Sequence, residues 1–415
     1  MNCLKGEADV KRDVIVLKQI PSGITAPKGF RAAGIHCGIK RKKKDMALIV
    51  SEVPGSAAGV FTNNRVKGAS VIVCQERVRG GKLQAILVCS GNANACTGKV
   101  GLENAYALTR MVAQRLGIPE DVVAATCTGV IGVQLPMDII ETGIQQIVEV
   151  LSEDGGNDAA EAIMTTDTVT KQVAFEVEIG GCTVRLGGMA KGSGMIHPNM
   201  ATMLAFIATD AEISSSALQT ALSRAVSKSF NMITVDGDTS TNDSVLVIAN
   251  GMSGCPEIIP DTPDFDAFSA ALDAVCIELA KMIVRDGEGA SKLIEINVRG
   301  ARTEEDAKRV AKAIANSNLV KTAVFGEDAN WGRIVCAVGY SGAEVDPDRI
   351  DVKLGSIKVC ENGHGLPYDE EFASEILRER EVVIQVDLKL GEGSARVWTC
   401  DLTYDYVKIN ASYRS

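Results

Sequence analysis

The sequence predicts a mixed α/β protein with a second, smaller α/β unit near its C-terminus. Three observations support this class. Apolar runs of strand length recur along the chain, longer segments repeat apolar residues at helical spacing, and after Leu293 the pattern alternates strand, helix and strand. A chain of 415 residues is long enough for two or three domains, or for one large domain with a subdomain.

The predicted strands are short apolar runs bounded by glycine, proline or small polar residues. The first of them ends at a turn formed by Pro54-Gly55, and alternating apolar residues on both sides of Gly180-Gly181 predict a β-hairpin. The strand ranges before the subdomain are Met46–Val53, Val71–Cys74, Ala85–Cys89, Val122–Thr126, Val173–Ile179, Cys182–Leu186, Met203–Ala208 and Val245–Ala249.

The predicted helices repeat apolar residues at three- and four-residue intervals. They are Leu102–Leu116, Met137–Leu151, Ile213–Phe230 with a serine cap, and a long helix that begins at Thr262-Pro263. The subdomain, at roughly 295–385, begins with strand Leu293–Val298 and helix Glu304–Ala315. The apolar segment Thr322–Phe325 is expected to be the second strand of this alternation. Val382–Leu388 and Ser394–Tyr404 are expected to close the chain as strands.

Composition narrows the classes of function. Hydrophobic residues make up 46% of the chain and charged residues 23%, which is typical of a soluble globular protein. The net charge of −10 argues against a nucleic acid or an anionic membrane as partner. Neither an 18-residue apolar run nor a signal peptide is present, so a cytoplasmic protein is expected. Twelve cysteines without a C-x-x-C pair and only three histidines predict no metal site.

The segment Lys191–Asp210 has two unlike halves. The first is glycine-rich and polar, and the second, Met203–Ala208, is an apolar run of strand length, with Thr202 at the joint. A threonine hydroxyl is a weak nucleophile unless a base lies beside it. Cutting the chain just before Thr202 would turn its own new α-amino group into that base, and the small Ala201 suits such a cut. A threonine that opens a strand can also be only a strand former.

Other loops are candidates for a site. Thr128-Gly129 follows a strand, and glycine lets backbone N–H groups turn toward an oxygen, as in an oxyanion hole. The small-residue run Ser90–Gly98 is a loop that could line a site. The acidic loop Val235–Ser244 invites a metal interpretation but lacks the twelve-residue calcium pattern. The helix end Arg285–Lys292 is either a solvated cap or presents Glu288 and Lys292 to a substrate.

Taken together, five stretches resemble the ornithine acetyltransferases, the glutamate N-acetyltransferases of the arginine pathway. The resemblance covers nearly the whole chain from about Ile20, and the combination is specific although each piece alone is not. The stretches are Lys191–Asp210, Thr128–Gly132, Gly91–Gly98, Arg285–Gly289 and Ile409–Tyr413.

The resemblance implies a layered α/β sandwich with a smaller second domain. It also implies self-cleavage between Ala201 and Thr202, which gives an α chain of residues 1–201 and a β chain of residues 202–415, assembled as α2β2. Thr202 matches the acetyl-accepting nucleophile, and Thr128 and Gly129 match the oxyanion-hole pair. The positions that hold the amino-acid substrate in the family match Thr165, Lys191, Thr202, Glu288, Asn410 and Ser415.

The implied reaction moves acetyl from N2-acetylornithine to glutamate through an acetyl-threonine and needs no cofactor. The sequence leaves open whether acetyl-CoA also serves as an acetyl donor. One alternative is an aminopeptidase or amidase that uses the same N-terminal nucleophile and passes the acyl group to water. Another is an uncleaved amino-acid-binding protein. Dependence on an acceptor tests the first alternative, and a denaturing gel tests the second.

Overall fold

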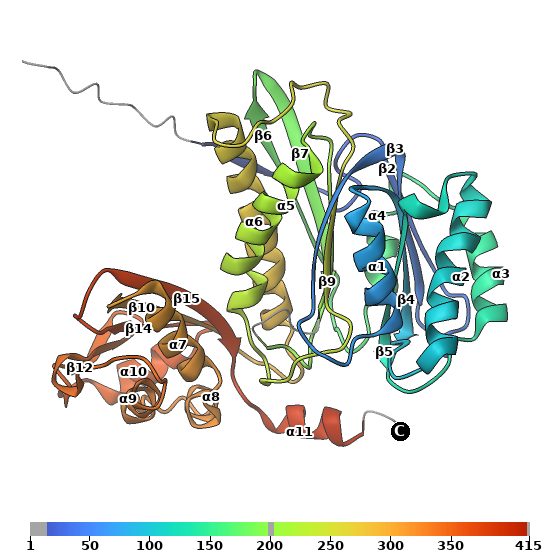
Figure 1. The fold of residues 1–415 in the computed structure, drawn as a ribbon. Helices are drawn as coiled ribbons and strands as arrows, with labels where there is room; N and C mark the ends of the chain where they lie inside the picture. The colour runs from blue at the N-terminus through green and yellow to red at the C-terminus, as the bar shows by residue number, and fades with distance from the viewer. Residues whose placement is uncertain (1–14, 198–202, 413–415) are drawn as a thin grey trace, which may run out of the picture.

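The computed structural model describes residues 15–197 and 203–412 (Figure 1). Those residues form two β-sheets with helices packed on them, so the predicted α/β class is confirmed. None of the described helices is both long and apolar enough to cross a membrane. The strands of the first sheet are β1 (Leu17–Ile20), β2 (Phe30–Ile35), β3 (Met46–Phe61), β4 (Lys82–Asn92), β5 (Val123–Val130), β6 (Lys171–Ile179), β7 (Cys182–Lys191), β8 (Leu204–Thr209) and β9 (Ser244–Ala249).

The second sheet and the helices complete the list. Its strands are β10 (Leu293–Ala301), β11 (Asp351–Leu354), β12 (Ile357–Glu361), β13 (His364–Gly365), β14 (Glu381–Asp387) and β15 (Gly393–Cys400). The helices are α1 (Ala69–Arg79), α2 (Gly98–Leu116), α3 (Met137–Glu149), α4 (Gly156–Ala162), α5 (Ser215–Lys228), α6 (Pro263–Arg285), α7 (Glu304–Ala315), α8 (Asn318–Phe325), α9 (Trp331–Gly339), α10 (Glu370–Arg378) and α11 (Tyr404–Ala411).

The first sheet has the strand order β1-β6-β7-β8-β9-β3-β4-β5, with β2 paired to β3. Most neighbouring strands are antiparallel, but β8 and β9 are parallel, as are β4 and β5. The predicted hairpin at Gly180-Gly181 is present as β6 and β7. The strand that begins after Thr202 therefore lies in the middle of the sheet, between β7 and β9.

Strand β3 differs from its prediction, because it continues through Pro54-Gly55 instead of turning there. Its pairing with β4 shifts register between Val50 and Gly55, and its second half pairs with β9. Such a bulge bends a strand without ending it. Gly55 is required at this point, since a Cβ there would lie 2.5 Å from the carbonyl oxygen of Ala249.

The bend at β3 produces a layered sandwich. Alternate residues of β8 belong to different cores: Phe206 lies in a middle core, and Ile207 packs in the core that contains α5 and α6. Strand β3 alternates in the same way, with Ile49 in the middle core and Leu48 in the core that contains α2 and α3. Figure 1 shows α5 and α6 on one outer side and α2 and α3 on the other.

Two predicted strands are helices in the structure. Val71–Cys74 lies in α1, where Ala69 and Val73 are buried one helical turn apart and Ile72 is 45% exposed. Thr322–Phe325 is the end of α8, which begins where the Ser317 hydroxyl accepts a hydrogen bond from the amide of Val320. A segment of only four residues fits the period of a strand and that of a helix equally well. Packing against neighbouring elements made both segments helical.

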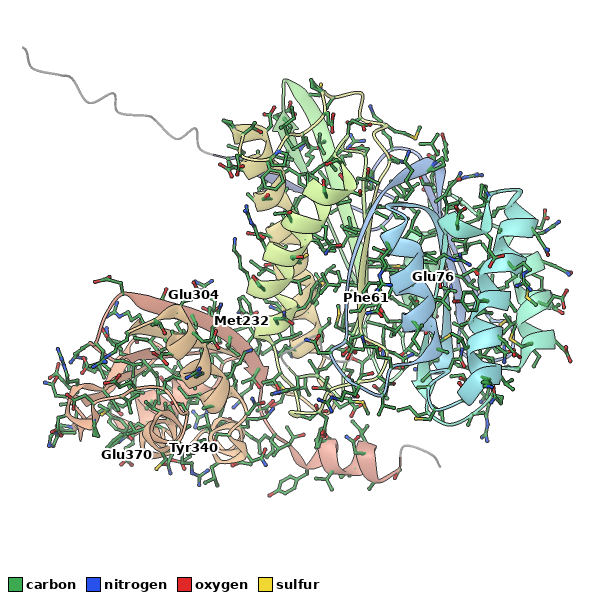
Figure 2. The ribbon with its side chains drawn as sticks, in the orientation of Figure 1. Phe61, Glu76, Met232, Glu304, Tyr340 and Glu370 are labelled. Atoms are coloured by element: carbon green, nitrogen blue, oxygen red, sulfur yellow. The ribbon has the colours of Figure 1, made fainter. Side chains whose placement is uncertain are left out.

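The smaller domain is built on the second sheet, whose order is β13-β12-β11-β14-β10-β15. Strands β10 and β14 are parallel, as a strand–helix–strand crossover requires. The sheet runs from Leu293 to Cys400 and so extends past residue 385. Side chains such as Tyr340 and Glu370 are exposed on this domain (Figure 2).

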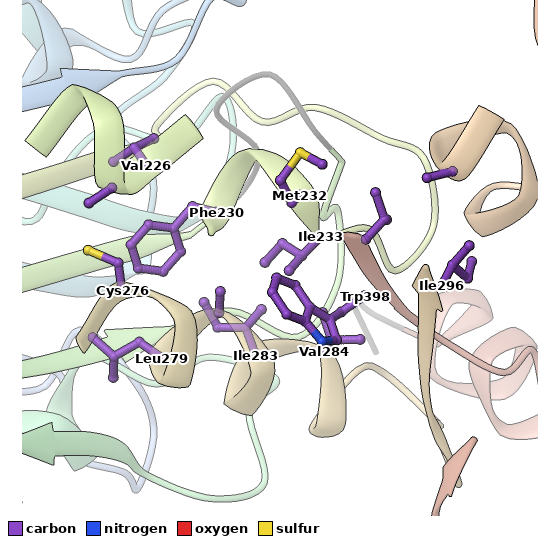
Figure 3. Packing of buried hydrophobic residues seen from close by; sticks show 14 of the residues in the cluster. Val226, Phe230, Met232, Ile233, Cys276, Leu279, Ile283, Val284, Ile296 and Trp398 are labelled. Carbon is purple, nitrogen blue, oxygen red and sulfur yellow. The ribbon is translucent and has the colours of Figure 1, made fainter. Parts of the chain in front are cut away.

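A continuous apolar core joins the two domains. Ile283 and Val284 at the end of α6 pack with Ile233 and Trp398 in one cluster (Figure 3). Ile233 also forms an isolated bridge to Trp398 in β15. This shared core holds the end of α6, and the loop that follows it, in a defined position relative to the main sheet.

The last predicted strand ends earlier than expected, at Cys400. Thr403 then begins α11, with its hydroxyl accepting a hydrogen bond from the amide of Asp405. The sequence did not predict this helix, which buries none of its residues. Helix α11 lies beneath the main domain in Figure 1 and carries Asn410.

Candidate active site

All of the predicted site residues that the structure describes line one cavity. They are Thr128, Gly129, Thr165, Lys191, Glu288 and Asn410. The cavity has a volume of about 230 Å³, below the roughly 300–1,000 Å³ of sites for drug-sized ligands, and so suits a small metabolite. Ala201, Thr202 and Ser415 lie outside the described residues. Five separate segments supply the six described residues, so the site exists only in the folded chain.

The C-terminal end of strand β5 brings Thr128 and Gly129 to the cavity. Gly129 has φ +133°, and a Cβ there would lie 2.3 Å from the carbonyl carbon of Gly91. Only glycine fits this close approach of β4 and β5. The Thr128 hydroxyl accepts a hydrogen bond from Lys191 Nζ at 3.4 Å. No described acceptor takes the hydroxyl's own hydrogen, which therefore remains available to an oxygen in the cavity.

Lys191 ends β7 and is 4% exposed. Burial lowers the pKa of its ammonium group, while the carboxylates of Asp167 and Glu288 act in the opposite direction. No carboxylate oxygen of a described residue lies within 4 Å of Lys191 Nζ. A buried cation without an ion-pair partner can bind an anionic group that enters the cavity.

Glu288 lies in the loop after α6 and is 7% exposed. A Cβ on Gly194 would lie 2.4 Å from the carboxyl carbon of Glu288, so the glycine lets the carboxylate pack against its loop. Asn410 Nδ2 of α11 donates a hydrogen bond to Glu288 Oε2 at 2.8 Å. Glu288 has no ion-pair partner among the described residues, and a buried carboxylate is stabilised by a cation. Lys292, the other candidate at this helix end, instead donates to the Val324 carbonyl of the second domain.

The loop Val235–Ser244, which the sequence offered only as a metal candidate, contributes Ser240, Thr241 and Asn242 to the cavity. Asn242 Nδ2 donates to the carbonyl oxygens of Ala93 and Cys127, at 2.6 and 2.9 Å. Asn242 therefore connects this loop to the residue that precedes Thr128. The available signal was a run of hydroxyl and amide residues directly before an apolar strand, the same order of polar and apolar halves that drew attention to the segment Lys191–Asp210.

The acidic part of that loop makes backbone hydrogen bonds. Asp236 accepts from the amides of Met195 and Ile196, at 2.6 and 2.8 Å. Asp243 accepts from the amide of Met203 at 3.0 Å. The described residues contain no group of three side chains that could hold a metal ion. The loop thus binds the chain on both sides of residues 198–202.

A buried ionic network lies behind the cavity. Lys171 Nζ is fully buried and contacts Asp167 Oδ1 at 2.7 Å and Asp286 Oδ2 at 2.5 Å. Asp167 also accepts hydrogen bonds from the amides of Thr165 and Gly192, at 2.9 and 2.7 Å. Burial acts to raise the pKa of Asp167, but the charges of Lys191 and Lys171 hold it below its usual value. The network joins the segments that carry Thr165, Lys191 and Glu288.

We expect Asp167→Asn to destabilise the protein by about 3–5 kcal/mol at pH 7, because it leaves the buried Lys171 short of one counter-charge. The pKa of Asp167 is depressed in the folded state. Its stabilisation is therefore present above pH ~4 and is lost as the pH falls through that depressed pKa. Urea unfolding of both proteins across this range measures the effect. Lys18→Ala, which breaks the exposed pair with Glu176, is the control; an equal loss in both variants would contradict the assignment.

Comparison with known proteins decides the family. The model of the ArgJ family matches residues 31–415. The chain belongs to the ArgJ family. It is 56% identical over 402 residues to the arginine biosynthesis bifunctional protein ArgJ of Symbiobacterium thermophilum, covering 96% of this chain and 100% of that protein. It is 54% identical to the protein of the same name from Caldanaerobacter subterraneus, covering 94% of this chain and 98% of the other.

Solved structures of ArgJ proteins are also similar to this chain. The crystal structure of arginine biosynthesis bifunctional protein ArgJ from Bacillus halodurans is 50% identical, with a TM-score of 0.49, and covers 50% of this chain and 98% of its own. Ornithine acetyltransferase of Mycobacterium tuberculosis, solved with ornithine, is 42% identical with a TM-score of 0.41, covering 44% of this chain and 98% of its own. Membership of the ArgJ family confirms the predicted enzyme class, an acyltransferase of arginine biosynthesis.

Proposed function

We propose that Thr202 is the nucleophile of an acetyl transfer from N2-acetylornithine to glutamate, and that the chain first cleaves itself between Ala201 and Thr202. The observation that carries this proposal is the cavity that collects Thr128, Gly129, Lys191 and Glu288. Met203, the residue bonded to Thr202, directly precedes the central strand β8. The described chain that follows the proposed nucleophile therefore leads directly into a middle strand of the sheet.

In the proposed reaction, the α-amine of Thr202 takes the hydroxyl proton while the hydroxyl oxygen attacks the acetyl carbonyl. The carbonyl electrons move onto oxygen, which accepts hydrogen bonds from the Thr128 hydroxyl and the Gly129 amide. As this intermediate collapses, the C–N bond breaks and the ammonium proton passes to the leaving amine of ornithine. Glutamate then attacks the acetyl-threonine by the reverse steps. Each oxyanion donor in such a site is worth roughly 3–4 kcal/mol.

The charges in the cavity suit both amino acids. Each amino acid brings a carboxylate, for which Lys191 is the buried cation. Ornithine also brings an ammonium group, for which Glu288 is the buried carboxylate without an ion-pair partner among the described residues. Asn410 orients that carboxylate through its hydrogen bond. Thr165 and Ser415 are proposed to complete the substrate site, in which the residues themselves suffice and no cofactor takes part.

The halves produced by cleavage, residues 1–201 and 202–415, are proposed to stay together in the cytoplasm as an α2β2 assembly. Strand β8 pairs with β7, and β9 pairs with β3, so strands of the second half lie between strands of the first. Separating the halves would expose the middle core and break two strand pairings. This supports one folded unit after the chain is cut.

The test is to incubate the purified protein with N-acetylornithine, with and without glutamate. We expect ornithine release to stop after about one acetyl group per site without glutamate, as ping-pong transfer requires, and to continue with it. Sustained release without glutamate would instead indicate an amidase that uses water. Labelled acetyl-CoA with glutamate, in a separate arm, determines whether acetyl-CoA is a second donor.

We expect Glu288→Gln to raise the KM for N-acetylornithine by about 30-fold or more, because losing one partner of a desolvated charge pair costs ~2–5 kcal/mol. Glutamine can still accept the hydrogen bond from Asn410, so mainly the charge is lost. Self-cleavage involves no free amino acid and should proceed, giving two chains on a gel. Glu381→Gln, which breaks an exposed pair with Arg285 at the end of α6, is the matched control. An unchanged KM in Glu288→Gln would mean that another group binds the ammonium.

A further inference from the structure

Asp243 is a buried carboxylate that the proposed reaction does not yet use. It is 1% exposed, and its Oδ1 accepts a hydrogen bond from the amide of Met203 at 3.0 Å. Its Oδ2 is buried and accepts no hydrogen bond from any residue that the structure describes. Buried polar atoms in proteins are normally hydrogen-bonded, so an unpartnered carboxylate oxygen indicates a missing donor.

Charge gives the same indication. Burial raises the pKa of Asp243 well above its usual value, although the amide of Met203, the charge of Lys191 and the nearby hydroxyls of Ser240 and Thr62 act to lower it. Among the described residues, no Lys, Arg or His nitrogen lies within 4 Å of a carboxylate oxygen of Asp243, so Lys191 affects Asp243 only from a longer distance. A buried carboxylate is costly unless a cation and hydrogen-bond donors accompany it. A further cation beside Asp243 would therefore offset its buried negative charge.

The position of Asp243 identifies the donor. The amide nitrogen of Met203 is covalently bonded to the carbonyl carbon of Thr202, so Oδ1 binds the first backbone amide after Thr202 in the sequence. The preceding residue of the same loop, Asn242, is bonded to the carbonyl of Cys127, next to Thr128. The parallel pairing of β8 and β9, with Leu204 opposite Ser244, holds Asp243 beside the start of β8.

We propose that Asp243 is a positioning residue that accepts a hydrogen bond from the α-amine of Thr202 and stabilises its ammonium form. The inference rests on the proposed function, because that amine exists only after cleavage. The amine takes the hydroxyl proton and later gives it to the leaving amine, while Asp243 remains a carboxylate throughout. The hydroxyl of Thr202 is then the nucleophile, its α-amine is the base, and the carboxylate of Asp243 orients that base.

The test variant is Asp243→Asn, which keeps an oxygen for the amide of Met203 and removes the charge. Because a nearby carboxylate favours an ammonium group, its loss should lower the pKa of the amine. The rising limb of the kcat/KM profile should move to lower pH by about 1 unit, and kcat should fall by roughly 10²-fold. The KM for N-acetylornithine should not change.

Asp210→Asn is the matched control. Asp210 follows the other end of β8, is fully buried, and its carboxylate also accepts backbone hydrogen bonds, from Lys28 and Arg185. Its pKa too is raised by burial. It does not line the cavity, so its variant should keep the wild-type kcat and pH profile. Any general effect of neutralising a buried carboxylate beside β8 would appear in this variant too.

Each outcome is decisive when activity is expressed per cleaved chain, as measured by intact mass. A lower kcat with a shifted limb in Asp243→Asn alone supports the proposal. An unchanged rising limb of the kcat/KM profile in Asp243→Asn, or an equal loss of kcat in Asp210→Asn, overturns the proposal. Complete failure of Asp243→Asn to cleave also overturns the proposal, because Asp243 would then be required before the α-amine exists. Wild-type protein that neither cleaves nor transfers acetyl would refute the proposed function itself.

Discussion

Thr202→Ala should abolish both self-cleavage and acetyl transfer. The side-chain hydroxyl is the proposed nucleophile for both reactions, and the base that serves the transfer appears only when the bond before residue 202 is cut. The variant should run as one full-length chain on a denaturing gel and release no ornithine from N-acetylornithine. Alanine keeps the backbone amide that precedes β8, so the sheet should form as in the parent protein.

Thr202→Ser is the matched variant, because serine keeps the hydroxyl and, after cleavage, the same α-amine. It should yield two chains and measurable transfer. Equal unfolding transitions of the alanine and serine variants would show that the difference lies in chemistry and not in folding. Two chains in the alanine variant would show that Thr202 is not needed for cleavage. A serine variant that neither cleaves nor transfers acetyl would show that a hydroxyl at residue 202 is not sufficient for either reaction.

The second large effect is expected at Thr128. Its hydroxyl accepts from Lys191, and no described acceptor takes its hydrogen, so it can donate to the oxyanion. Thr128→Val keeps the volume and the branching at Cβ but removes that donor. We expect kcat to fall by roughly 10²–10³-fold, with little change in the midpoint of unfolding. Cleavage can slow as well, since it forms an oxyanion of its own.

Thr126 provides the control on the same strand. It is buried in β5, two residues before Thr128, and its hydroxyl has no hydrogen-bond partner among the described residues. Thr126→Val should therefore leave turnover unchanged and leave the stability of the protein equal or greater. Full activity in Thr128→Val would reduce Thr128 to a strand-end residue, and equal losses in both variants would indicate a packing effect.

Elements with a long, regular pattern were predicted well. The hairpin at Gly180-Gly181 and the long helix that begins at Thr262 formed as expected, because turn residues and caps act within a few positions. Short apolar segments such as Val71–Cys74 were predicted as strands and are helical. Four residues do not distinguish the two periods, and the neighbours against which they pack are distant in the sequence.

By itself the sequence determined the candidate residues for the chemistry: a threonine between a glycine-rich loop and an apolar run of strand length, and a Thr128-Gly129 pair after a predicted strand. Those features are local, so motifs reveal them. Only the tertiary structure decided which polar residues line the cavity. Asp286 contacts Lys171 across 115 positions, and Asn242 reaches Cys127 across the same separation. Residue spacing does not encode such contacts, because they depend on how the sheet folds back at β3.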